Sequence, residues 1–166
     1  KVKGLFEFSD ADDPDMGNVM GQPKLVRMKL AGTSDYRWFV AVSSGFNNYQ
    51  ADGNASTTGK QALFLLSVDK ASSDAWQLNT NYYKVVLSTP SNSKPAALSN
   101  PGVAYDLQGN AILLYAGDTQ GNLWKFDFQN GLSASMASSA VKTSGSTPVP
   151  MAILKDSSNR MQPITT

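Results

Sequence analysis

The most informative part of the chain is Tyr115-Ala-Gly-Asp-Thr-Gln-Gly-Asn-Leu-Trp-Lys-Phe-Asp-Phe128. It predicts a β-hairpin: an apolar strand, a turn rich in Gly and Asn, and a second strand over 123–128. Because side chains alternate along a strand, Trp124, Phe126 and Phe128 are expected to share one face. An aromatic face of this kind more often packs against a neighbouring sheet than lines a ligand groove, so we predict packing.

Similar strands recur at a nearly constant spacing. Leu5-Phe6-Glu7-Phe8 and Leu63-Phe64-Leu65-Leu66 resemble the strand that starts at Leu123, and the three leucines are 58 (63 − 5) and 60 (123 − 63) residues apart. A β unit that returns at such a spacing is typical of the blades of a propeller. The sequence therefore predicts an all-β fold: a partial β-propeller of two to three blades, each an antiparallel four-stranded sheet, as a fragment of a larger propeller.

The predicted blades organise the chain as one domain. Its units are a blade remnant over 1–21, a blade over 22–98, a blade over 99–160 and the start of the next blade over 161–166. Strands are expected at 4–9, 22–28, 37–42, 62–68, 82–88, 102–107, 112–116, 123–128 and 151–155. The segments between them are interpreted as a long hairpin loop (43–60), a connection between blades (91–101) and a loop or short helix (132–147). Both ends resemble interrupted β structure, so we expect a longer parent protein.

The composition excludes several classes of function. The net charge of +1 gives no reason to expect nucleic acid or an acidic membrane surface as a partner. With no Cys and no His, the chain has no thiol nucleophile, no Ser-His catalysis and no zinc site of the usual Cys and His ligands. No apolar run approaches the roughly 20 residues of a membrane-spanning helix. We therefore expect no catalytic residues and no membrane span in this chain.

Other motifs extend the pattern along nearly the whole chain. They are the strand and acidic turn Leu5-Phe-Glu-Phe-Ser-Asp-Ala-Asp-Asp-Pro-Asp-Met-Gly17, then Gly21-Gln-Pro23, Phe39-Val-Ala-Val-Ser-Ser-Gly-Phe-Asn-Asn48 and Gln162-Pro-Ile-Thr-Thr166. Together with 115–127, and in this order, they resemble the C-terminal propeller of the PilC/PilY family. Proteins of this family assemble type IV pili and are also described as tip-associated adhesins.

The resemblance implies an exported, pilus-associated protein of the periplasm, outer membrane or cell surface. It implies a non-enzymatic module that supports pilus assembly against retraction and takes part in surface attachment. The partners implied are pilus proteins or a host or surface receptor, and no bound cofactor is expected. Two alternatives stay open: a propeller enzyme of the quinone-dependent dehydrogenase type, and a carbohydrate-binding propeller module.

Family members commonly carry a calcium loop, resembling an EF-hand, just before the Tyr-Ala-Gly-Asp segment. In the corresponding stretch of this chain only Asp106 supplies a carboxylate, whereas Gln108 and Asn110 supply neutral oxygens. These three residues are the weak metal candidates of the sequence. Calcium prefers six to eight oxygen ligands with several charges among them, so we predict that this loop does not hold the ion tightly.

The densest group of carboxylates lies near the N-terminus, at Asp10, Asp12, Asp13 and Asp15. A cation site is one interpretation. The other, which we favour, is a turn in which Asp side chains accept hydrogen bonds from backbone amides and Pro14 fixes the backbone.

The polar loop over 46–60 contains the candidate partner-binding residues. Amide groups and an aromatic ring combine hydrogen bonding with stacking, which suits sugar hydroxyls or a protein partner. A solvated hairpin tip is the commoner structure for such a loop. The candidates are Asn47, Asn48, Tyr49, Asp52 and Asn54.

Overall fold

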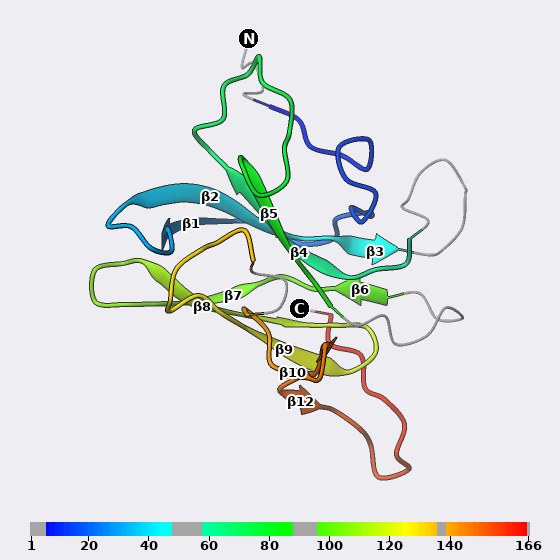
Figure 1. The fold of residues 1–166 in the computed structure, drawn as a ribbon. Coiled ribbons are helices and arrows are strands. Elements are labelled where there is room, and N and C mark those ends of the chain that lie inside the picture. Colours follow the sequence, from blue (N-terminus) through cyan, green and yellow to red (C-terminus); the bar gives the residue numbers. More distant parts are fainter. Residues whose placement is uncertain (1–5, 48–57, 88–95, 136–138, 166) are drawn as a thin grey trace.

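The computed structural model describes residues 6–47, 58–87, 96–135 and 139–165 and contains only strands and turns in these ranges (Figure 1). Two four-stranded antiparallel sheets form its centre, one above the other in the view of Figure 1. In order across the first sheet are β1 (Lys24–Lys29), β2 (Tyr36–Ser43), β4 (Ala62–Ser67) and β5 (Tyr82–Val86). The second contains β7 (Gly102–Tyr105), β8 (Ala111–Gly117), β9 (Asn122–Asp127) and β12 (Ala152–Ile153).

The repeat predicted from the sequence is present in both sheets. In each sheet the order of the strands across the sheet is also their order along the chain. Counted in this order, β4 and β9 are the third strands of their sheets. The segments that begin at Leu63 and Leu123 lie in these two strands, so they are structurally equivalent. The all-β prediction and the antiparallel four-stranded units are therefore confirmed, and the two sheets lie within the ranges predicted for the two complete blades.

The N-terminal member of the repeat differs from the prediction. Residues 6–9, the described part of the strand expected at 4–9, are not in a strand. Phe8 instead packs its ring against Phe64, Trp76 and Tyr82, with centroids 5.1 to 5.5 Å away. Burial of this ring on the first sheet replaces the ladder of hydrogen bonds that the alternating pattern had suggested.

Two small sheets correct the loop assignments. β3 (Gly45–Asn47) pairs with β6 (Ala96–Leu98), so the segments expected as a hairpin loop and as a connection between blades each contain a strand. β10 (Thr143–Ser144) and β11 (Thr147–Pro148) form a short hairpin within the stretch expected as a loop or short helix. Such two- and three-residue strands are too short for periodicity to reveal.

The core lies between the two large sheets. Leu63 and Leu65 of β4 belong to the same buried cluster as the aromatic face of the second sheet. Trp124, Phe126 and Phe128 are 1%, 0% and 3% exposed, so the predicted packing role of this face is confirmed. Each such side chain removes a large apolar area from water, which makes this contact the main stabilising term between the sheets.

One buried carboxylate connects this core to the turns. Asp118 is fully buried, and its Oδ2 accepts hydrogen bonds from Trp124 Nε1 and Asn122 Nδ2, both at 2.9 Å. The same oxygen accepts a bond at 3.2 Å from Nε2 of Gln61, which directly precedes β4 in the first sheet. Its Oδ1 accepts the N–H groups of Gln120 and Asn122. Asp118 therefore joins its own turn, the aromatic face and the neighbouring sheet.

The turn at Asp118 is one of three with the same hydrogen bonds. In each, Oδ1 of an Asp accepts the N–H groups two and four residues later. The residue three positions after the Asp has a positive φ: 79° at Gly109, 81° at Gly121 and 63° at Asn159. The turns begin at Asp106, Asp118 and Asp156. The first two share the pattern Asp-x-Gln-Gly-Asn, whose Gly and Asn predict a turn.

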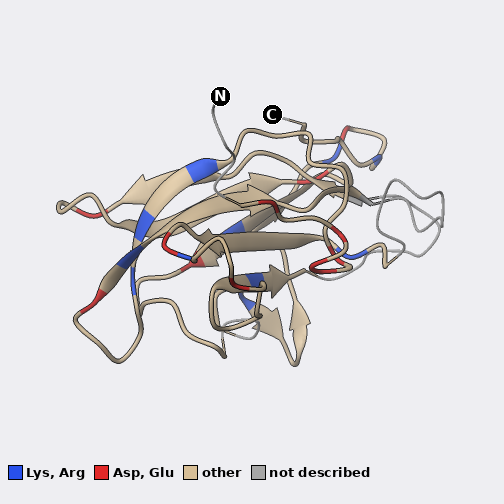
Figure 2. Cartoon of the chain, turned by 90° about the horizontal axis from the view of Figure 1, so that it is seen from above, with Lys and Arg blue, Asp and Glu red and all other residues tan. Residues whose placement is uncertain are grey.

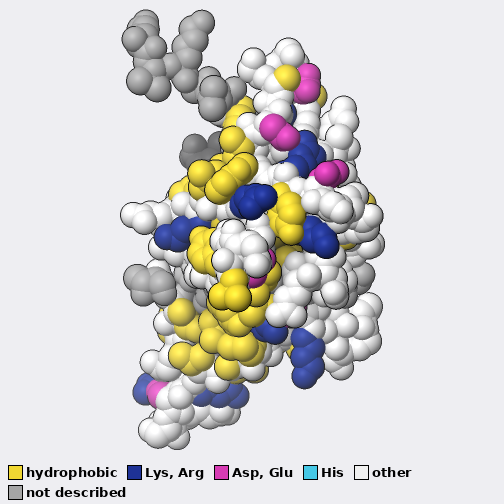
Figure 3. Space-filling model, turned by 90° about the vertical axis from the view of Figure 1, so that its left-hand side faces the viewer, with side chains coloured by type: hydrophobic (Ala, Val, Ile, Leu, Met, Phe, Trp, Pro, Cys, Tyr) yellow, Lys and Arg dark blue, Asp and Glu magenta, His cyan; other side chains and the backbone are white. Residues whose placement is uncertain are grey.

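The charged residues are distributed over several elements (Figure 2). Hydrophobic side chains are exposed among Lys and Arg on the side seen in Figure 3. The β1–β2 and β7–β8 turns point toward this side in Figure 1, and they carry or adjoin the exposed residues Tyr36, Tyr105 and Leu107. This side of the described chain therefore presents apolar surface at its turns.

We predict that Asp118→Asn lowers the free energy of unfolding by about 2–3 kcal/mol, because the amide nitrogen that replaces one carboxylate oxygen cannot accept the bonds of the buried donors. Asp106→Asn is the matched control, since Asp106 begins the same turn without the contacts to Gln61 and Trp124. Its expected cost is smaller, because the Asp106 turn is exposed to solvent. Urea unfolding followed by circular dichroism measures both, and equal losses for the two variants would refute the special role of Asp118.

Candidate functional site

The partner-binding loop predicted from the sequence lies mostly outside the described residues. Asn48, Tyr49, Asp52 and Asn54 fall in the range 48–57, for which the structure gives no description. The backbone of Asn47 belongs to β3 and pairs with Ala96 of β6. These five residues therefore stay a prediction.

The candidate metal residues lie in the first of the three Asp turns. Asp106 Oδ1 accepts the N–H groups of Gln108 and Asn110 at 2.9 and 2.8 Å, and its Oδ2 accepts Asn110 Nδ2 at 2.8 Å. These hydrogen bonds, with that from the Asn110 side chain first among them, hold the pKa of Asp106 below its usual range. The structure brings Asp106 and Asn110 together, and it involves Gln108 through its backbone.

This arrangement does not fit a tight calcium site. Both carboxylate oxygens of Asp106 are directed at N–H donors, whereas calcium needs oxygen atoms around it. One carboxylate also falls short of the several charges that calcium sites supply. Across the described ranges, no group of three or more Asp, Glu, His or Cys side chains is placed to hold a metal ion. The turn thus has the contacts of a structural element.

The acidic cluster near the N-terminus combines a turn with a buried ion-pair network. Asp12 Oδ2 accepts the N–H of Ser9 at 2.8 Å, as expected for a turn. Asp13 and Asp15 are instead buried, and Lys84 Nζ lies 2.8 Å from Asp13 Oδ1 and 2.6 Å from Asp15 Oδ2. The interpretation as a simple capped turn was therefore incomplete, since two of the four carboxylates bind a lysine from β5.

Two further side chains complete this network. The Tyr82 hydroxyl donates to Asp13 Oδ2 at 2.8 Å, and Lys60 Nζ lies 3.8 Å from Asp15 Oδ1. Sequence analysis missed Lys84, although a lysine between apolar residues of the strand Tyr82–Val86 is a signal for a buried ion pair. The network fastens the N-terminal segment to the outer strand of the first sheet.

The pKa values of Lys84 and Tyr82 follow from this burial. Burial disfavours the charged ammonium of Lys84, but the hydrogen bonds and charges of Asp13 and Asp15 outweigh it and raise its pKa. Burial, followed by the hydrogen bond to Asp13, strongly raises the pKa of Tyr82. Both groups therefore keep their protons more tightly in the folded chain than in the unfolded one.

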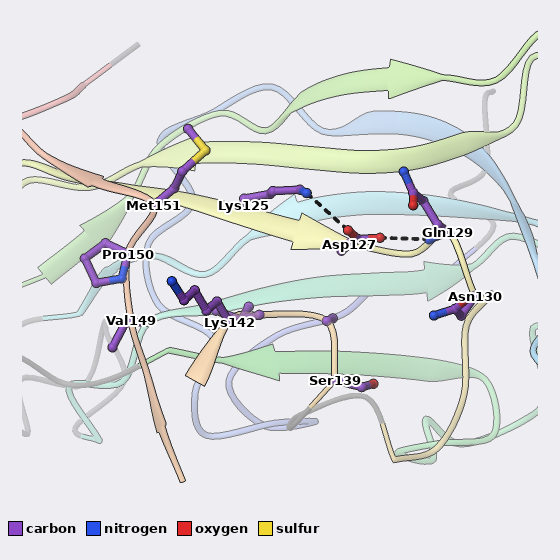
Figure 4. Close-up of a pocket in the computed structure, with 11 residues that line it drawn as sticks. Lys125, Asp127, Gln129, Asn130, Ser139, Lys142, Val149, Pro150 and Met151 are labelled. Carbon is purple, nitrogen blue, oxygen red and sulfur yellow. Dashed lines mark hydrogen bonds and ion pairs between the residues drawn. The ribbon is translucent and has the colours of Figure 1, made fainter. Parts of the chain in front are cut away.

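A cleft of about 490 Å³ lies beside β9 (Figure 4). It is bounded by the end of β9, by residues 139–142 and by residues 149–151. Lys125 Nζ pairs with Asp127 Oδ2 at 3.2 Å, and Asp127 Oδ1 accepts the N–H of Gln129 at 3.1 Å. Figure 4 shows Lys142 on the opposite side of this opening. The weak pattern of the 139–151 segment gave no signal for this cleft in the sequence.

We predict that Lys84→Met lowers the free energy of unfolding by about 2 kcal/mol or more, because two buried carboxylates lose their cation. The cost should stay below the about 3–5 kcal/mol of a fully buried pair, since the Lys84 side chain is 16% exposed. Lys29→Met, at an exposed position of β1, is the control and should change stability by less than about 0.5 kcal/mol.

The raised pKa values also predict a pH dependence. A group whose pKa is raised by folding stabilises the folded state fully below its unfolded pKa, which is about 10 for both Tyr and Lys. This contribution is lost as the pH rises through the folded pKa. Urea unfolding should therefore show a loss of stability above about pH 10 that is smaller in Lys84→Met than in the unchanged chain. An identical pH dependence in the two proteins would contradict the network.

Comparison with known proteins places the chain in a family. The model of the PilY1 beta-propeller domain matches residues 10–165. The type IV pilus biogenesis factor PilY1 homolog of Xylella fastidiosa is 26% identical over 97% of this chain and 10% of its own length. PilY1 of Pseudomonas aeruginosa strain PAO1 is 28% identical over 78% of the chain and 9% of its own length. The chain thus spans about a tenth of these relatives.

A solved structure supports the same assignment. The crystal structure of the Pseudomonas aeruginosa PilY1 C-terminal domain superimposes with a TM-score of 0.65 at 26% identity. The match covers 97% of this chain and 30% of the crystallised one. The matched region is therefore less than a third of the crystallised chain. The chain belongs to the PilY1 beta-propeller domain family.

Proposed function

We propose that the chain is a non-enzymatic propeller module of a protein that assembles type IV pili. The observation that supports this most strongly is the family match over 10–165, together with relatives that are named type IV pilus biogenesis factors. In this proposal the parent protein is exported and pilus-associated, and its partners are pilus proteins. The described residues of the chain include no helix with the length and apolar character needed to span a bilayer.

The proposal has two finer parts. The first is that the parent protein supports assembly against retraction, and the second is that it contributes to attachment at surfaces through a receptor. Both derive from the family resemblance of the ordered motifs. A quinone-dependent enzyme and a carbohydrate-binding module are the competing functions, and the contacts described above favour neither.

We predict that an in-frame deletion of the parent gene abolishes surface pili and that the unchanged gene restores them. If the protein opposes retraction, removing the retraction motor from the deletion strain should restore pili without restoring attachment. A gene that carries Asp106→Asn should restore pili in the deletion strain fully, since this substitution alters one exposed turn. Sheared surface pilin, twitching and adhesion to an inert surface are the measurements. Normal piliation in the deletion strain would contradict the proposed function.

We further propose that the Asp106 turn holds its shape without calcium. Neither 1 mM calcium nor a chelator should then move the melting temperature of the chain by more than about 1 °C. Changing Gln108→Asp and Asn110→Asp together places carboxylates at alternate positions and should introduce calcium-dependent stabilisation. This stabilisation reaches about 2.7 kcal/mol when the free calcium concentration is a hundred times the Kd of the site. A chelator that lowers the melting temperature of the unchanged chain by several degrees would refute the proposal.

A further inference from the structure

The outer edge of β9 is open at Lys125. Phe128, just after the strand, donates its N–H to Ile112 O of β8 at 2.9 Å. In an antiparallel sheet, alternate residues direct their main-chain groups to opposite sides. Leu123, Lys125 and Asp127 therefore direct theirs away from β8, toward the side where β12 joins the sheet.

The neighbours of Lys125 along this edge already have partners. Leu123 O accepts the N–H of Met151 at 2.8 Å, and Asp127 donates its N–H to Ala140 O at 2.7 Å. Within the part of the chain that the structure describes, the main-chain N–H and C=O of Lys125 have no hydrogen-bond partner on this side. One N–H and one C=O are thus presented side by side between two occupied positions.

The sequence before β12 explains why this position stays open. β12 pairs only with Asn122 and Leu123, and residues 149–150 before it do not continue this pairing to Lys125. Pro150 has no N–H to donate, and Val149 donates its N–H to Lys142 O at 2.9 Å. Neither residue can supply the donor that would close the edge at Lys125.

The cleft of about 490 Å³ lies against this open edge (Figure 4). Its volume falls within the range of about 300–1,000 Å³ that is usual for ligand pockets. An added strand lies about 4.8 Å from its neighbour, and three extended residues span about 10 Å. The cleft wall supplies apolar contact from Val149 and Met151, and polar contact from Lys125 and Lys142.

The charges of the cleft favour an acidic occupant. Asp127 is paired with Lys125, which leaves Lys142 as the cation without an ion-pair partner among the described residues that line the cleft. Lys142 is exposed and faces the opening (Figure 4). A carboxylate in the occupant would form a charge-assisted hydrogen bond with its ammonium group.

We propose that the Lys125 edge of β9 binds an extended peptide segment of another protein, which joins the second sheet as a short strand. The segment bonds to the N–H and C=O of Lys125, as in other cases of strand addition to a sheet edge, and places an Asp or Glu beside Lys142. This interaction surface is inferred from the edge and the cleft alone, so it stands or falls separately from the pilus assignment.

The test uses the full-length parent protein and a fluorescein-labelled, end-blocked peptide of five alternating valines and glutamates. Fluorescence anisotropy should show saturable binding. Hydrogen exchange resolved to single residues should show slower exchange of the Lys125 amide when the peptide is present. The same peptide with a central proline cannot complete the main-chain bonds and should not bind.

Substitutions at Lys142 separate this site from unspecific binding. Lys142→Glu should weaken binding of the acidic peptide by about tenfold and should favour binding of a peptide with lysine in place of glutamate. Lys142→Arg should retain binding of the acidic peptide. Lys29→Glu, an exposed charge reversal on β1, should leave the affinity unchanged. The proposal is overturned by absence of saturable binding, by equal affinity of the Lys142→Glu variant for the acidic peptide, or by slow exchange of the Lys125 amide before peptide is added. The last result would mean that the parent protein covers this edge itself.

Discussion

A buried carboxylate is costly in a protein interior unless hydrogen-bond donors surround it. Asp118 meets this condition with donors from its own turn, from Trp124 on the aromatic face and from Gln61 beside the neighbouring sheet. The same five bonds therefore fix the β8–β9 turn, orient the largest buried side chain and set the position of one sheet relative to the other. Apolar burial supplies most of the stability between the sheets, and Asp118 makes their arrangement specific.

Carboxylates serve structure repeatedly in this chain. Asp106 holds the backbone of an exposed turn, and Asp13 and Asp15 bind Lys84 to fasten the N-terminal segment to the first sheet. Carboxylates whose spacing suggests a cation site thus bind backbone amides and an ammonium group. Among the described residues, main-chain groups without a partner lie at the β9 edge at Lys125, where a proline interrupts the approach of the last strand.

The sequence predicted the parts of the fold that depend on local periodicity. The strand at 62–67 is a continuous apolar run, the strand at 122–127 alternates between buried and half-buried residues, and the turns at Asp106 and Asp118 have strong turn patterns. The Asp156 turn was missed because it shares only its first residue with the others. The β3–β6 pair depends on contacts between distant segments, which a single sequence does not encode in any local pattern. Lys84 in an apolar strand signals a buried ion pair, but the strand alone does not reveal that its partners are Asp13 and Asp15. The cleft was missed for the same reason.

Gln61 and Asp118 couple two successive propeller sheets through one buried hydrogen bond. A double-mutant cycle with Gln61→Leu and Asp118→Asn tests this coupling directly, with the free energy of unfolding measured for both single variants and the double variant. Coupled neighbours show interaction energies of about 0.5–3 kcal/mol, and the account predicts a value in this range. Additive losses, with an interaction energy near zero, would contradict it.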